Sequence, residues 1–153
     1  MPASPHVMIV EAPYYAHIAE ELARGAIQAL DAGGASYERF TVPGAFEIPA
    51  AIALAARSAK RFDGFVALGC VIRGETTHYD HICAETARSL QDLMVRDGIA
   101  VGYGILTCEN EAHALVRAAL PDTDKKGRDK GGEATRACLA LIELRRRFQG
   151  PES

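Results

Sequence analysis

The sequence predicts one α/β domain, in which a four-stranded parallel sheet lies between two layers of helices, and three observations support this prediction. Short apolar or β-branched segments alternate with segments whose apolar residues recur at helical spacing. The length of 153 residues suffices for one domain with a full core. No repeat, linker or low-complexity stretch divides the chain. Strands that alternate with helices, in the order βαβαβαβαα, are typical of a parallel three-layer sandwich.

The first half of the chain is predicted to contain two strands and two helices. The apolar run at residues 7–10 indicates a buried strand. Apolar residues at helical spacing from 18 to 30 predict a helix that ends at Gly33. Alternation and β-forming residues at 37–42 predict the second strand, and the alanine-rich segment 48–59 is predicted to be a helix.

The second half is predicted to contain two more strands and three more helices. The strands are expected at residues 64–72 and 100–106, and the helices at about 77–96, 109–119 and 133–147. A polar, basic segment at 121–132 is expected to be a loop before the last helix. That helix is expected to bury Cys138, Leu141, Ile142 and Leu144.

Composition and charge exclude several classes of protein. A net charge of −3, from 17 basic and 20 acidic residues, gives no support to non-specific binding of nucleic acid or membrane. The four cysteines are widely spread without a C-x-x-C pair, which favours free thiols over a disulfide framework or a zinc site. Residues 1–5 do not resemble a signal peptide, and no apolar run approaches membrane-spanning length. We therefore expect a cytoplasmic protein whose domain spans residues 1–153, with flexible ends at 1–5 and 149–153.

Three strand ends carry unusual residues. In open parallel sheets, ligands bind beyond the carboxyl ends of the strands. The segments 13–15, 43–47 and 69–78 each lie at the end of a predicted strand, so we expect them to converge on one site. Tyr14 could stack on a flat heterocycle there, although a single tyrosine in a loop is more often a packing residue. The turn around Phe46 and Glu47, stiffened by two prolines, could present a carboxylate or could simply be a rigid turn.

The segment from Gly69 to His81 suggests an anion site beside an acid–base group. A strand that ends in a glycine turn and opens a helix directs free backbone N–H groups and the positive end of the helix dipole at a ligand. Thr76 or Thr77 could instead cap the helix, and both roles can hold together. His78 is then a candidate proton carrier rather than a surface histidine. His78 and His81 could share a metal-binding face, but no third ligand is evident, so we expect no metal.

Together, these segments resemble those of the 6,7-dimethyl-8-ribityllumazine synthase family over nearly the whole chain. The matching motifs are 42–49, 69–80, 104–110 and 129–134. The resemblance implies a flavodoxin-like fold and a transferase of riboflavin biosynthesis. Its members condense 5-amino-6-(D-ribitylamino)uracil with L-3,4-dihydroxy-2-butanone 4-phosphate, releasing phosphate and water, without a metal or organic cofactor.

The resemblance also implies roles for individual residues. His78 would transfer protons. The pyrimidine, with its ribityl chain, would contact Tyr14, Ala45, Phe46, Glu47, Cys70, Val71, Ile72 and Tyr103. The phosphate would bind the backbone N–H groups of Glu75 and Thr76, together with Arg117 and Lys130.

In this family the active sites lie between adjacent subunits of a pentamer. Tyr103 lies early in its strand and Arg117 well along the next helix, so a single subunit would struggle to bring them to His78. In the family, both come from the adjacent subunit. The loop from Leu120 to Lys130 is longer than in relatives that build icosahedral shells, so we expect a free homopentamer.

Residues 13–15 depart from the Arg-Phe-Asn of many members of the family. This departure keeps open an alternative, a non-catalytic binder of flavin or lumazine with the same fold. A flavodoxin-like electron carrier is a weaker alternative, because the first strand is followed by an acidic residue and no glycine-containing phosphate loop.

Overall fold

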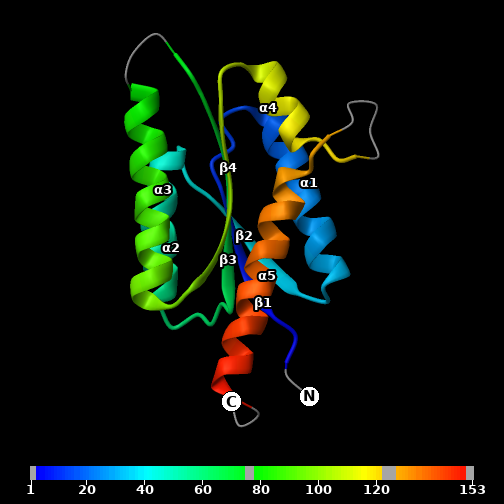
Figure 1. Ribbon diagram of the computed structural model, residues 1–153, viewed down its shortest axis with the longest axis vertical. Coiled ribbons are helices and arrows are strands. Elements are labelled where there is room, and N and C mark those ends of the chain that lie inside the picture. The colour runs from blue at the N-terminus through cyan, green and yellow to red at the C-terminus, as the bar shows by residue number, and fades with distance from the viewer. Residues whose placement is uncertain (1–2, 75–77, 122–126, 151–153) are drawn as a thin grey trace.

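Four parallel strands form the centre of the molecule, in the spatial order β2-β1-β3-β4 (Figure 1). They are β1 (His6–Glu11), β2 (Ser36–Thr41), β3 (Gly64–Ile72) and β4 (Ala100–Cys108). The structure is a computed structural model that describes residues 3–74, 78–121 and 127–150. The predicted α/β fold with a parallel four-stranded sheet is confirmed.

Helices cover both faces of this sheet (Figure 1). They are α1 (Ala16–Ala32), the 3-10 turn η1 (Ala45–Glu47), α2 (Ile48–Ala56), α3 (His78–Asp97), α4 (Glu111–Ala118) and α5 (Lys130–Gln149). One face carries α1, α4 and α5, and the other carries α2 and α3. The chain therefore forms the predicted three layers.

The sheet is buried on both faces, because side chains alternate along each strand. In β3, Val66 and Leu68 belong to the core under α1, α4 and α5, whereas Phe65 and Ala67 belong to the core under α2 and α3. All four side chains are at most 2% exposed. This explains why β3 is a continuous apolar run in the sequence.

Helix α5 begins at Lys130, so the predicted loop at 121–132 is wrong at its carboxyl end. Asp129 adopts a left-handed backbone conformation, and its Oδ1 accepts a hydrogen bond from the backbone N–H of Gly132 at 3.0 Å. Gly131 does not break the helix. A Cβ there would lie 2.1 Å from the carbonyl oxygen of Leu22, so glycine is what lets α5 touch the backbone of α1.

The burial predicted for α5 is correct for Cys138 and Ile142, which lie in the core. Leu141 is partly buried against the same core. Leu144 was expected to be buried, but it is 43% exposed, because it lies about 200° around the helix from the buried Ile142. The other differences are small: α2 ends at Ala56, and β4 continues to Cys108.

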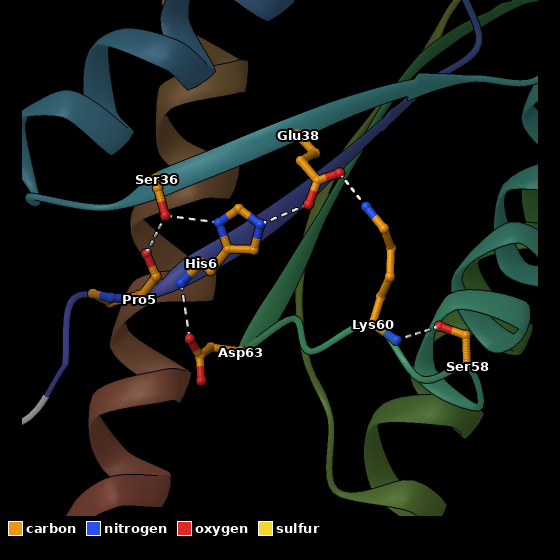
Figure 2. A network of polar contacts seen from close by, with 7 residues as sticks. All are labelled: Pro5, His6, Ser36, Glu38, Ser58, Lys60 and Asp63. Carbon is orange, nitrogen blue, oxygen red and sulfur yellow. Dashed lines mark hydrogen bonds and ion pairs between the residues drawn. The ribbon is translucent and has the colours of Figure 1, made fainter.

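The amino ends of the strands are joined by a polar network around His6 (Figure 2). Its ring nitrogens lie 2.7 Å from Ser36 Oγ and 2.8 Å from Glu38 Oε2, and its backbone N–H donates to Asp63 Oδ2 at 2.8 Å. Lys60 also contacts the Glu38 carboxylate. Hydrogen bonds from Lys60 and then from His6 hold the pKa of Glu38 below its usual value. The network connects β1, β2 and the start of β3. It lies at the amino ends of the strands, whereas the predicted site lies at their carboxyl ends.

Candidate active site

The carboxyl ends of β2, β1 and β3 meet at one end of the sheet, as the sequence predicts. The backbone N–H of Val42 donates to the carbonyl of Glu11 at 2.8 Å, and that of Ala12 donates to the carbonyl of Leu68 at 2.9 Å. A Cβ placed on Gly69 would lie within 3.8 Å of both Ala12 and Ala45. The chain after β1, the turn after β2 and the end of β3 are therefore neighbours.

An open hollow of about 430 Å³ lies between the ends of β1 and β2. It is lined by Pro13, Tyr14, Thr41, Val42 and Pro43, which we call the Tyr14 groove. The ring of Tyr14 is 76% exposed. A ring that is exposed at the rim of a groove offers its face for stacking on a flat ligand.

The turn after β2 carries the expected aromatic and carboxylate groups. Ala45 is buried under the turn, whereas Phe46 is 55% exposed. A Cβ on Gly44 would lie 3.2 Å from a carboxylate oxygen of Glu47, so the carboxylate lies over the glycine. The backbone N–H of Glu47 also donates to the carbonyl of Gly44 at 3.1 Å. This short 3-10 turn holds Phe46 and Glu47 at the sheet edge.

The end of β3 provides half-buried side chains at Cys70, Val71 and Ile72. Burial, followed by the nearby Cys108 and Glu111, raises the pKa of the Cys70 thiol to about 12. Cys70 is therefore a neutral thiol near pH 7, which lines the site rather than attacking a substrate.

His78 is the first residue of α3 and is exposed, at the same end of the sheet as the carboxyl ends of the strands. The candidate anion-binding residues Glu75 and Thr76, and the candidate cap Thr77, lie outside the described residues. His78 therefore has the position that the sequence predicts for a proton carrier at a helix start.

Arg73 is a structural residue of this edge that the sequence analysis missed. Its guanidinium lies 4.7 Å from the ring centre of Tyr79, 3.3 Å from Asp80 Oδ1 and 3.2 Å from Glu109 Oε2. Its backbone N–H donates to the carbonyl of Cys108 at 2.9 Å. Arg73 thus connects the end of β3 to the first turn of α3 and to the end of β4. Its partners at the end of β4 are distant in sequence, so no local signal indicates that connection.

Tyr103 and Arg117 lie on opposite faces of the sheet. Tyr103 is half-buried against the core under α2 and α3, and burial raises the pKa of its hydroxyl. Arg117 lies in α4 on the other face, where its Nη1 donates to the carbonyl of His113 at 3.1 Å. It also lies beside Cys108, whose pKa it lowers against the larger, raising effect of burial. Within one copy of the chain, the sheet therefore lies between these two predicted site residues.

Lys130 is the first residue of α5, where its Nζ pairs with Glu133 Oε1 at 3.1 Å. Within residues 3–74, 78–121 and 127–150, no group of three His, Cys, Asp or Glu side chains could hold a metal ion. No helix in that part of the chain is both long enough and apolar enough to cross a membrane.

The family is decided by sequence comparison. A sequence model of 6,7-dimethyl-8-ribityllumazine synthase matches residues 4–146. The chain belongs to the lumazine synthase family. The resemblance inferred from the motifs is thereby confirmed, and the Tyr14 groove and His78 lie in a lumazine synthase fold.

Relatives of the same name cover almost the whole chain. The lumazine synthase of Sphingopyxis alaskensis is 54% identical over 143 residues, which are 94% of this chain and 96% of that protein. That of Bartonella tribocorum is 49% identical over 148 residues, covering 97% and 95%. The protein named 6,7-dimethyl-8-ribityllumazine synthase 1 of Rhizobium meliloti is 51% identical over 147 residues, covering 94% and 93%.

Proposed function

We propose that this chain condenses 5-amino-6-(D-ribitylamino)uracil with L-3,4-dihydroxy-2-butanone 4-phosphate. The products are 6,7-dimethyl-8-ribityllumazine, phosphate and water. The observation that carries the proposal is the family match over residues 4–146, on a fold whose strand ends converge as the reaction requires. Mixing the purified protein with both substrates tests it. Appearance of lumazine absorbance and fluorescence is expected, and its absence at high enzyme concentration contradicts the proposal.

The chemistry needs a proton carrier and two well-held reactants. The pyrimidine's 5-amine adds to the ketone, and a first water leaves to give an imine. Phosphate is then eliminated, and the ribitylamine nitrogen adds to the remaining carbonyl carbon, so that the ring closes as a second water leaves. Each of these steps moves a proton, and a histidine can both give and take one near neutral pH. His78 is the group that we assign to this role. Holding both reactants side by side replaces a bimolecular encounter. This lowers the activation free energy by an amount on the order of several kcal/mol.

We assign the pyrimidine to the Tyr14 groove. Its ring would stack on Tyr14, and Ala45, Phe46 and Glu47 would hold the ring and ribityl chain. The half-buried segment Cys70–Val71–Ile72 would line the ring's edge. Exposure of Tyr14 at this hollow, and of Phe46 three residues after its lining residue Pro43, supports this assignment.

We assign the phosphate to the start of α3. The backbone N–H groups of Glu75 and Thr76 would bind it, with Arg117 and Lys130. Arg117 can grip a phosphate with two parallel hydrogen bonds, which suits a site that must hold the anion until it leaves.

The complete site would form between adjacent subunits of a homopentamer. Tyr103 and Arg117 would both come from the adjacent subunit and meet His78 there. The position of Tyr103 early in β4 and of Arg117 well along α4 supports this. The loop from Leu120 to Lys130 would obstruct packing of pentamers into a shell. Light scattering is expected to give about 82 kDa for five chains of 16.4 kDa. A decamer would double this mass, and a particle of sixty subunits would contradict the proposal.

Two further points accompany this assignment. No observation on the structure favours the alternative, a non-catalytic binder of flavin or lumazine; tight flavin binding without turnover would select it. We propose a cytoplasmic location, which the free thiols of Cys70, Cys83, Cys108 and Cys138 support.

A further inference from the structure

An ion pair with one buried partner joins β1 and β2, the two strands whose ends form the Tyr14 groove. Glu11, the last residue of β1, is 5% exposed. Its Oε2 accepts a hydrogen bond from Arg39 Nε at 2.8 Å, and its Oε1 accepts one from Arg39 Nη2 at 2.9 Å. Two parallel bonds between a carboxylate and a guanidinium fix the orientation of both groups as well as their distance. None of the roles assigned above includes this pair.

The pair crosses between the two strands that form the groove. Arg39 lies on β2 opposite Ile9, whereas Glu11 lies opposite Thr41, so the side chains meet diagonally across the strands. The Arg39 side chain is 47% exposed, in a hollow between β2 and α1, while that of Glu11 is 6% exposed. Glu11 is thus the enclosed partner, and Arg39 reaches it from the solvent side.

Two connections lead from Glu11 to the walls of the groove. Its carbonyl accepts the hydrogen bond from Val42, the residue that precedes the Pro43 turn. Its side chain lines a small cavity with Tyr15, whose ring makes an edge contact with Tyr14 at 4.9 Å between ring centres. A shift of Glu11 would therefore move both the Tyr14 ring and the turn on the other side of the groove.

Stability alone does not explain a charge pair at this place. A buried ion pair costs desolvation energy, and apolar residues of similar volume often replace one without loss of stability. The two parallel hydrogen bonds between Glu11 and Arg39, called the fork below, also fix the relative position of β1 and β2. They do so just before the two strands lead into Tyr14 and Pro43.

We propose that Glu11 and Arg39 are positioning residues, which set the width of the Tyr14 groove and thereby the affinity for the flat pyrimidine. The inference rests on the proposed function, because it takes the groove as the pyrimidine site. Neither residue touches the reacting atoms.

The most direct variant is Arg39→Lys, which keeps the charge on an exposed stem but cannot form the fork. It is expected to raise the KM for the pyrimidine about tenfold and to change kcat by less than about threefold, since a small misplacement weakens ring binding before it affects chemistry. The KM for the butanone phosphate is expected to stay unchanged. Equal KM values for the pyrimidine in the variant and the parent chain would overturn the proposal.

A double variant separates positioning from stability. Glu11→Leu combined with Arg39→Met fills the same space without charge, and it is expected to unfold at no lower urea concentration than the parent chain. Its KM for the pyrimidine is expected to remain raised about tenfold, because the fork is absent. Full recovery of the KM in this folded variant would show that the pair serves stability only. Glu38→Gln is the matched control, because it removes a paired carboxylate from the same strand at the other face; unchanged kinetics are expected.

Direct binding keeps this test separate from the proposed activity. The probe is the product, 6,7-dimethyl-8-ribityllumazine, added to the parent chain and to Arg39→Lys and followed by its fluorescence. A roughly tenfold weaker Kd in the variant supports the positioning role even if turnover is not observed. Turnover by the parent chain together with equal Kd values would refute the positioning role and leave the proposed function standing.

Discussion

Tyr103 and Arg117 face opposite sides of the same sheet. Tyr103 packs towards α2 and α3, and Arg117 lies in α4 beside Cys108. We propose that both side chains are supplied by one subunit to His78 of the adjacent subunit, because Tyr103 lies early in β4 and Arg117 well along α4.

The first prediction is complementation between inactive variants. His78→Ala and Arg117→Ala are each expected to lower turnover strongly when expressed alone. Coexpressed, they are expected to regain activity, because random assembly in a ring leaves roughly a quarter of the interfaces with an intact His78 facing an intact Arg117. Turnover of the coexpressed mixture is the measurement. A mixture no more active than its parts would show that both residues act within one chain.

Thr86 provides a prediction about stability. It is 1% exposed in α3, and its hydroxyl has no hydrogen-bond partner among the residues that the structure describes. A buried polar group without a partner costs about 1–3 kcal/mol. Thr86→Val is therefore expected to raise the free energy of unfolding by about 1 kcal/mol in urea titrations. A lower unfolding midpoint would show that the hydroxyl is satisfied.

Asp129 is expected to be essential for the start of α5. Asp129→Ala removes the cap at Gly132 and places alanine in a left-handed conformation, so a loss of about 2–3 kcal/mol is expected. Asp129→Asn is the matched control, because asparagine accepts the same hydrogen bond and tolerates that backbone. It is expected to cost less than half as much in urea titrations. Equal losses would mean that the charge, paired with Arg136, matters more than the cap.

Cys138 predicts how stability changes at high pH. Burial raises the pKa of its thiol from 9.0 to about 12. Below pH 9 the thiol is neutral in both states, so it adds no pH dependence. Above pH 9 it ionises only in the unfolded chain, so the unfolded state gains and folding stability falls by up to about 1.4 kcal/mol per pH unit.

Cys138→Ala removes this contribution. Urea midpoints measured between pH 8 and pH 11 are expected to fall less steeply for the variant than for the parent chain. Other groups titrate in that range in both proteins, so the difference between the slopes is the informative quantity. Parallel slopes would show that the folded chain ionises Cys138 as readily as the unfolded one.

The strands and the first helices could be predicted because their signals are local. The run at 64–72 is apolar throughout, and the spacing from 18 to 30 identifies one helical face. The start of α5 could not be predicted in this way. Gly131 looks like a helix breaker, and its actual role depends on the backbone of Leu22, more than a hundred residues earlier.

The candidate site divides along the same line. The positions of Tyr14 and His78 at this end of the sheet could be predicted because each follows a strand within a few residues. The link from Arg73 to β4 and the pair of Glu11 with Arg39 were missed because those partners are remote in sequence. Arg73 lies 36 residues from Glu109, and Glu11 lies 28 residues from Arg39. Only the order of the strands brings these charges together.

The His6 network has a practical consequence for handling this enzyme. Lys60 and Glu38 lie near the amino ends of the strands (Figure 2). Substrates would enter at the opposite end of the sheet, where the strands have their carboxyl ends. A bead, an electrode or a dye coupled near the amino ends of the strands would leave the opposite end open to substrates. Coupling through Lys60 itself would remove its contacts with Glu38 and with the rings of Phe40 and Phe62. Linkers on nearby exposed positions would avoid that loss and leave the proposed site uncrowded.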